Sequence, residues 1–243
     1  MSLLKTVSFA SLLLSTTTVA QILPFEAEYA ASFKGIPIAT GYRQLIKLNH
    51  NVFQIKSRAS ALGGGFSYDD TSRFSYQQEQ VQTLGFVHKQ KSLFSHLQAI
   101  GHPDRKGGLI VEINGKSHHF EAPEDVKQLM DTAGFSVQLQ NDLKNGLTDM
   151  NYHYNAIDEI ENYRFNVIGK ETINTELGEF KTLKLEQKKR EGRKTWLWLA
   201  PALDYQLVKA EIIRNDKSWA TLEATRITIE QSSPPEQQTE KSL

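Results

Sequence analysis

The chain of 243 residues contains no cysteine. It therefore has no disulfide framework, no thiol nucleophile and no thiolate metal site, and no lipid can be attached to it through an N-terminal cysteine. An excess of either charge is also missing, because 28 Lys and Arg residues balance 28 Asp and Glu residues. A chain without net positive charge lacks the electrostatic footprint of a nucleic-acid-binding protein, so we expect no nucleic-acid partner.

Apolar runs long enough to cross a membrane are missing as well. The apolar stretch Val7–Leu14 is well below the roughly 18–20 residues that span a bilayer. It follows a short basic front and precedes Thr18 and Ala20, small residues that fit a cleavage site before Gln21. This pattern predicts a cleaved secretory signal peptide over residues 1–20, which leaves no transmembrane span in the processed protein.

The sequence also lacks the common catalytic and nucleotide-binding motifs. The run Gly63-Gly64-Gly65 belongs to neither GxGxxG nor GxxxxGK[ST], and neither GxSxG nor HExxH occurs. The adjacent residues His118 and His119 would point to opposite faces of a strand, where they cannot easily chelate one metal ion. We therefore expect no metal site and no cofactor, and we favour a non-enzymatic protein over an enzyme.

What the sequence does contain is a long series of strand patterns. The most distinctive segment, residues 193–213, predicts two strands joined by a corner at Ala200–Asp204. Trp196 and Trp198 lie two residues apart in it, so they share one strand face, and Trp198 is expected to pack in the core or at its margin. Asn114-Gly115 between two further strand patterns is a strong signal for a tight hairpin.

One helix interrupts these strands, and the whole pattern indicates the fold class. The helix is predicted from Asp131 to Gly146, with apolar residues four positions apart. Many antiparallel strands and one helix predict a single mainly β domain over residues 21–230. We expect a large curved antiparallel sheet or barrel with one short helical segment, because a sheet of about a dozen strands curls to hide its edges. The polar, proline-bearing residues 231–243 predict a disordered tail.

Four segments together resemble a known family. They are Tyr29–Gly41, the helix over 131–146, Tyr163–Gly178 and, most specifically, TWLWLAPALDY at Thr195–Tyr205. The chain resembles the exported bacterial proteins grouped as domain of unknown function 3108. The resemblance implies a β-rich, signal-peptide-bearing protein of the Gram-negative envelope with a periplasmic location. It implies no assigned reaction, so it provides no catalytic residues.

Aromatic and charged residues on the strands suggest a ligand-binding interior. Core packing explains each aromatic residue singly, but a curved sheet with an aromatic interior can also enclose an apolar cavity. An inward arginine, Arg73 or Arg43, would position a polar group of the ligand. Asp69-Asp70 before Arg73 also fits a surface charge pair. The candidate ligand-binding residues are Tyr68, Asp70, Arg73, Tyr76, Trp196 and Trp198.

Three functions remain open from the sequence. The first is a non-enzymatic periplasmic binding protein for an amphipathic ligand, such as a lipid or an envelope-derived fragment. The second is an envelope scaffold with a filled core and an envelope protein as partner. The third and least favoured is a hydrolase. A cavity lined by the aromatic residues would favour the first, and a solid core with an exposed apolar patch would favour the second.

Overall fold

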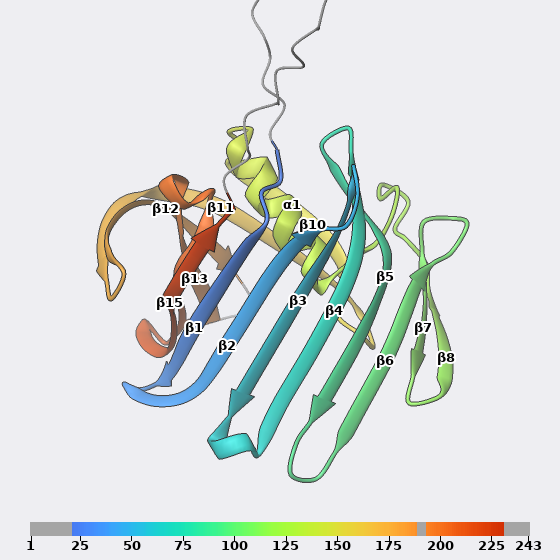
Figure 1. Ribbon diagram of the computed structural model, residues 1–243, viewed down its shortest axis with the longest axis horizontal. Coiled ribbons are helices and arrows are strands. Elements are labelled where there is room, and N and C mark those ends of the chain that lie inside the picture. Colours follow the sequence, from blue (N-terminus) through green and yellow to red (C-terminus); the bar gives the residue numbers. More distant parts are fainter. Residues whose placement is uncertain (1–20, 189–192, 231–243) are drawn as a thin grey trace, which may run out of the picture.

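The computed structural model describes residues 21–188 and 193–230 of the chain (Figure 1). The predicted signal peptide and the predicted tail lie outside these residues. Within the described ranges, the only α-helix is too short and too polar to be a candidate for crossing a bilayer.

Among the described residues, fifteen strands form one sheet in which the chain runs up and down between neighbouring strands. Starting from one edge, the spatial order is β8-β7-β6-β5-β4-β3-β2-β1-β15-β14-β13-β12-β11-β10-β9. Every pair is antiparallel except β9 with β10. The strands are β1 (Phe25–Phe33), β2 (Ile36–Lys47), β3 (Val52–Ala61), β4 (Phe66–Gln77), β5 (Gln80–Lys91), β6 (His96–Pro103), β7 (Leu109–Ile113), β8 (Lys116–Phe120), β9 (Met130–Asp131), β10 (Asp149–Asn155), β11 (Ile160–Thr175), β12 (Gly178–Lys188), β13 (Arg193–Ala200), β14 (Gln206–Arg214) and β15 (Lys217–Ile229).

The sheet is curved but not closed. It curls so that β10 to β13 lie behind the front layer of β1 to β5, as Figure 1 shows. The edge strands β8 and β9 do not pair with each other in the described residues. The prediction of a mainly β domain with one large curved antiparallel sheet is therefore confirmed.

Short turns connect most of the strands, so strands that follow each other in the chain also pair with each other. Asn114 and Gly115 both have positive φ, 48° and 80°, and they join β7 to β8 with Ile113 opposite Lys116. Such a two-residue turn matches the twist of the strands it connects. The predicted Asn-Gly hairpin is confirmed. The corner after Trp198 is also confirmed, as the short 3-10 turn η2 (Pro201–Leu203) between β13 and β14.

The helix α1 (Thr132–Lys144) fills the interior of the curved sheet. Asp131 caps its N-terminus by accepting a hydrogen bond from the Gly134 amide at 3.0 Å, which satisfies one of the unpaired donors of the first turn. One side of the helix packs with Val137 against a core from β1 to β5. The other side packs with Leu139 and Leu143 against β10 to β14. The helix predicted over 131–146 is confirmed, and it covers the upper part of the interior.

Candidate functional site

A cavity of about 250 Å³ lies inside the curved sheet, below the helix. Its wall is a row of directly paired residues on four adjacent strands, Tyr29, Gly41, Ala59 and Tyr68. Two members of this row are small, so the strands come together without filling the space between the two tyrosines. The other side chains that face the cavity are Ala31, Ala39, Arg43, Leu207 and Leu222.

The small residues of this row leave space that larger residues could occupy. A Cβ atom placed on Gly41 would lie 3.7 Å from both the Arg58 carbonyl oxygen and the Tyr29 Cβ, which are ordinary van der Waals contacts. Gly41 also lacks a positive φ. Neither the backbone nor the packing therefore demands glycine here. The cavity results from small side chains at Gly41 and Ala59, at a place where core strands usually carry larger ones.

Arg43 supplies the positive charge at this cavity. It belongs to the neighbouring row of paired strand residues, on the side of the helix, and its Nη2 donates a hydrogen bond of 2.7 Å to Ser136 Oγ of α1. Its Nε is buried and has no hydrogen-bond partner in the described residues. Burial raises the pKa of the Tyr29 and Tyr68 phenols, and the charge of Arg43 opposes both shifts. The cavity is thus an apolar space with a cation and two neutral phenols at its wall.

A paired acid and histidine occupy the neighbouring part of the interior. Asp70 and His88 stand opposite each other on β4 and β5, and Asp70 Oδ1 contacts His88 Nδ1. The His88 ring stacks against Tyr68, with 6.4 Å between the ring centroids. Ser57 is paired with Asp70 on the other side. The acid therefore separates the serine from the histidine, whereas a catalytic triad needs the histidine between the serine and the acid.

The structure brings together two of the predicted site residues, Tyr68 and Asp70. Tyr76 faces the same interior but lies closer to the upper end, where its hydroxyl donates a hydrogen bond of 2.5 Å to Asn141 of α1. Burial and nearby acidic groups raise the pKa of Tyr76 to about 12. Tyr76 is thus part of the contact between sheet and helix, away from the cavity.

The structure does not bring Arg73 to the cavity. Its neighbours along β4, Ser72 and Phe74, are buried, and Phe74 is part of the interior core. Arg73 points to the other face, where it is exposed and its Nε lies 3.4 Å from Gln54 Oε1. Of the two arginines considered as the inward one, Arg73 is therefore not on the face that Tyr68 and Asp70 share. The strand alternation itself is the reason, and Arg43 takes that position instead.

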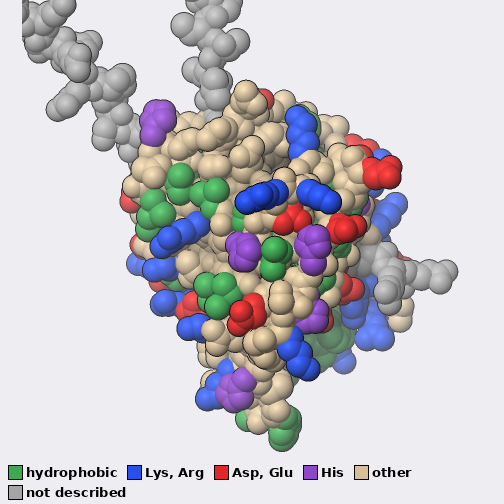
Figure 2. Space-filling view, turned by 90° about the vertical axis from the view of Figure 1, so that its right-hand side faces the viewer, with side chains coloured by type: hydrophobic (Ala, Val, Ile, Leu, Met, Phe, Trp, Pro, Cys, Tyr) green, Lys and Arg blue, Asp and Glu red, His purple; other side chains and the backbone are tan. Residues whose placement is uncertain are grey.

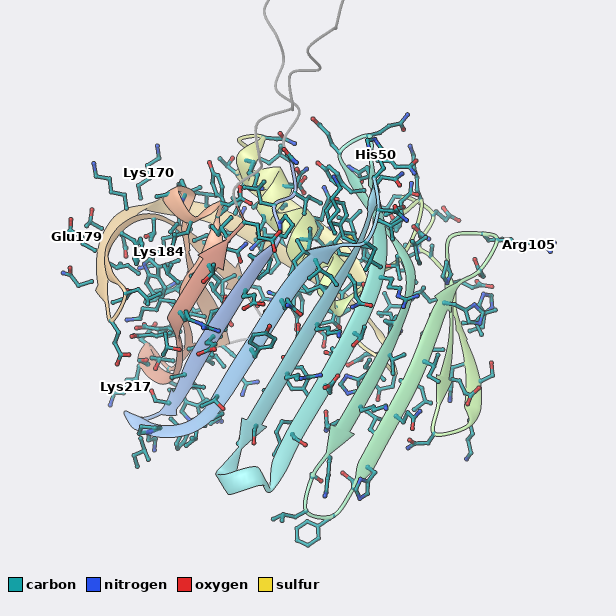
Figure 3. All side chains as sticks on the ribbon, in the orientation of Figure 1. His50, Arg105, Lys170, Glu179, Lys184 and Lys217 are labelled. Atoms are coloured by element: carbon teal, nitrogen blue, oxygen red, sulfur yellow. The ribbon has the colours of Figure 1, made fainter. Side chains whose placement is uncertain are left out.

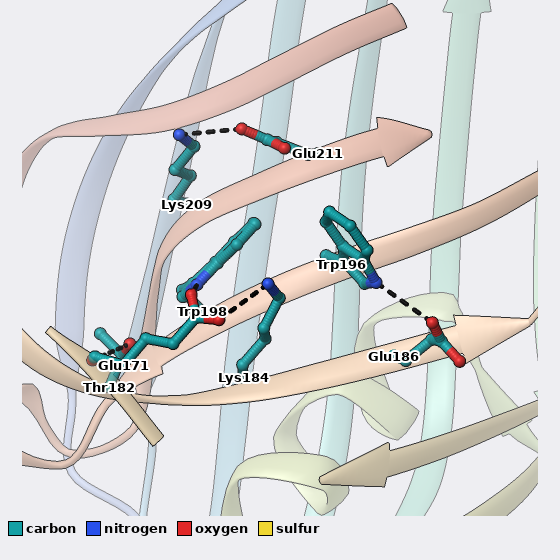
Figure 4. A network of polar contacts seen from close by, with 8 residues as sticks. All are labelled: Glu171, Thr182, Lys184, Glu186, Trp196, Trp198, Lys209 and Glu211. Atoms are coloured by element: carbon teal, nitrogen blue, oxygen red, sulfur yellow. Dashed lines mark hydrogen bonds and ion pairs between the residues drawn. The ribbon is translucent and has the colours of Figure 1, made fainter. Parts of the chain in front are cut away.

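Trp196 and Trp198 also lie away from the cavity, on the outer face of the sheet. They share this face with Lys184 and Glu186, their partners on β12 (Figure 4). Lys184 Nζ lies 4.1 Å and 4.8 Å from the ring centroids of Trp196 and Trp198. The Trp198 indole N–H donates a hydrogen bond of 2.7 Å to Glu171. The two tryptophans share a strand face, as predicted, but their rings pack in a local cluster on the outer face of the sheet.

A broad groove of about 830 Å³ is lined by residues of β1 to β6. Its side chains include Tyr42, Lys89 and the ion pair between Arg58 and Asp69, whose atoms lie 2.6 Å apart. The groove also borders Tyr29, Gly41, Ala59 and Tyr68 of the inner row, so it adjoins the cavity. The groove is wide and charged, whereas the inner cavity is mainly apolar.

Sequence reasoning missed His88 as a member of the site. The feature that could have placed His88 is the β4–β5 hairpin, whose turn residues Gln78 and Glu79 both have positive φ. Counting back from this turn, with one bulge after Arg73, places His88 opposite Asp70. No group of three or more metal-ligating side chains lies close enough together to hold a metal ion within residues 21–188 and 193–230.

Comparisons with known proteins agree with this fold. The chain is similar to a crystal structure of a beta-barrel-like protein of domain of unknown function DUF1849 from Brucella abortus, with a TM-score of 0.58 and 8% identity. That match covers 87% of this chain and 100% of the other chain, and at this identity it shows the fold alone. No curated protein matches the chain. The family described as protein of unknown function (DUF3108) matches residues 28–225, so the chain belongs to this family.

Proposed function

We propose that this protein is an exported, periplasmic binding protein for an amphipathic ligand with an anionic group. The observation that supports it is the apolar cavity with Arg43 at its wall, whose Nε is buried without a hydrogen-bond partner among the residues that the structure describes. A buried donor without an acceptor is costly, so a ligand oxygen at this position would be favoured. The export part of the proposal rests on the sequence of residues 1–20.

The size and lining of the cavity limit what it can hold. Small-molecule sites commonly measure about 300–1,000 Å³, and this cavity measures about 250 Å³. It therefore suits one segment of a ligand, such as a short acyl or other apolar group, with the rest extending out of the interior. Burial of the apolar segment contributes about 25 cal/mol per Å² before ordering costs. The planar guanidinium of Arg43 suits a carboxylate or a phosphate.

The two alternatives have weaker support. A hydrolase is disfavoured by the order Ser57, Asp70, His88 across the strands, which gives the histidine no serine to activate. A scaffold with a filled core is supported by the tightly packed interior around α1, where side chains such as Phe74 and Leu185 are fully buried. The cavity distinguishes the binding protein from the scaffold, and a binding measurement can separate them.

The test is displacement of a fluorescent fatty acid from purified protein. Ala59→Leu should fill the cavity and abolish saturable binding while the melting temperature stays equal or rises. Arg43→Met should weaken binding of an anionic ligand about 10- to 100-fold, which corresponds to a lost charged hydrogen bond of about 1.5–3 kcal/mol. The control is Arg73→Met on the outer face, which should leave the affinity unchanged.

Two results would count against the proposal. Absence of saturable binding at tens of micromolar ligand would favour the scaffold. Unchanged binding in Ala59→Leu would move the site out of the cavity. Export is tested separately, by N-terminal sequencing of the protein recovered from the periplasm, which should begin at Gln21. An intact Met1 in the membrane fraction would contradict it.

A further inference from the structure

The most exposed large hydrophobic side chains gather in three turns of the sheet. They are Ile36 at 65%, Leu62 at 71%, Leu93 at 73% and Phe94 at 95% exposed. The remaining large hydrophobic residues of the described chain are at most 48% exposed. Single exposed apolar residues are common on protein surfaces, but a group of nearly bare ones marks an interaction site.

These turns lie at the same end of the molecule. They connect β1 to β2, β3 to β4 and β5 to β6, so the up-and-down order places all three at the lower end in Figure 1. The last two turns touch, because a Cβ on Gly65 would lie 3.5 Å from Leu93 Cδ2. Figure 2 shows hydrophobic side chains at the lowest point of the molecule, with Lys, Arg and His side chains above them.

Positive charge surrounds these apolar side chains. We define the rim as the turns 33–37, 61–66, 91–96, 113–117 and 214–218, which all lie at the lower end. Figure 3 places Lys217 there, beside the β1–β2 turn, and His50 at the opposite end. The rim has one acidic residue, Asp216, against five basic residues, and all six are exposed. The basic residues are Lys34, Lys91, Lys116, Arg214 and Lys217.

This charge is local, since the whole chain has no net charge. The acidic turn with Asp158 and Glu159 does not join the rim. Ile157 and Ile160 on either side of it pack into the core cluster around Phe86, behind β5 and β6. The rim therefore combines exposed apolar side chains with a net positive charge, while the remaining residues of the chain together carry the compensating negative charge.

We propose that the rim docks onto the surface of an anionic lipid bilayer. Apolar side chains flanked by Lys and Arg are the combination that binds at the boundary between headgroups and acyl chains. Leu93 and Phe94 would enter this boundary first, with Leu62 and Ile36 beside them, while the lysines contact anionic headgroups. The proposal does not rest on ligand binding in the cavity, because a protein with a filled interior could dock in the same way.

The test exploits the absence of cysteine, since a single introduced cysteine can carry an environment-sensitive label. The protein is purified in the form in which it accumulates in the cell, and its N-terminus is sequenced. Phe94→Cys and Leu147→Cys, at the opposite end, are labelled with a nitrobenzoxadiazole dye and mixed with vesicles of phosphatidylglycerol and phosphatidylethanolamine. The dye at position 94 should brighten and shift to the blue, and the dye at position 147 should not.

Co-sedimentation with the same vesicles then tests the two components of the rim. Leu93→Ser/Phe94→Ser should weaken partitioning about tenfold or more, because it removes the inserted apolar area. Lys34→Glu/Lys91→Glu should abolish binding to anionic vesicles, whereas the same charge change at the other end, Arg105→Glu/Lys106→Glu, should not. Binding should also be lost with phosphatidylcholine vesicles or at high salt, because salt screens exposed charges.

Several results would overturn the proposal. One is equal dye response at both ends, and another is unchanged sedimentation of Leu93→Ser/Phe94→Ser. If the rim instead joined two copies of the chain, the protein would sediment as a dimer without vesicles, and the Leu93→Ser/Phe94→Ser variant would be monomeric. Melting temperatures equal to that of the parent protein show that each variant is folded.

Discussion

The outer cluster around Trp198 offers a sharp test of how the sheet is stabilised. Trp198 is only 5% exposed although it lies on the outer face, because Ala200, Val208 and the curled ends of β11 and β12 cover it. Its indole N–H is bound to Glu171, and the pKa of that carboxyl is lowered by the hydrogen bond from Lys184 and next by the one from Trp198. Replacing Trp198 by alanine removes both the buried ring and this hydrogen bond.

The expected magnitude follows from these two losses. Truncation of a buried tryptophan to alanine costs about 3–5 kcal/mol of unfolding free energy. Trp198→Phe keeps an aromatic ring and removes the N–H donor. It should cost only about 0.5–1.5 kcal/mol, because the Glu171 side chain is 42% exposed and water can replace the donor. Trp196→Ala should cost less than Trp198→Ala, because Trp196 is only half-buried.

Urea unfolding followed by far-ultraviolet circular dichroism measures these differences directly. The full Trp198→Ala loss corresponds to a fall in melting temperature of about 6–20 °C for a domain of this size. The order Trp198→Ala, Trp196→Ala, parent protein should hold in both measurements. A loss below about 1 kcal/mol in Trp198→Ala would refute the reasoning, since it would mean that the outer cluster does not bury the ring under native conditions.

Two further predictions concern the interior. Gly101→Ala should lower the free energy of unfolding by about 1–3 kcal/mol, as overpacking does, because its Cβ would lie 2.1 Å from the Phe86 ring. Adding Phe86→Leu should restore most of this loss, measured by urea unfolding. If it restored nothing, the strain would lie elsewhere. Burial raises the pKa of Asp131, so the folded state holds this proton more tightly than the unfolded state. Its contribution to stability is present below the unfolded pKa of about 3.9 and is lost as the pH rises through the folded pKa. Asp131→Asn should therefore gain stability relative to the parent protein as the pH rises above about 4, and parallel curves of stability against pH would contradict this.

The sequence by itself determined the local elements of this protein. Strands show a period of two, Asn114-Gly115 requires a tight turn, and Asp131 supplies a capping oxygen at the start of α1. Each of these signals acts over a few residues, so the strands, the helix and the mainly β class could be predicted. The alternation within β4 also contained the information that Arg73 faces away from Tyr68 and Asp70.

Only the tertiary structure decided which strand face became the interior. Trp196 and Trp198 are two of the three tryptophans of the chain, yet they lie outside, because the sheet curls around α1 toward the opposite face. The curl depends on the sum of all strand twists and on the helix that fills the space, which no single segment specifies. The pairing of Asp70 with His88 depends on a register that includes one bulge, and the cavity depends on Gly41 and Ala59 of two neighbouring strands coming into line. Local patterns therefore determined the elements, whereas contacts between distant segments placed Arg43, rather than Arg73 or the tryptophans, at the candidate site.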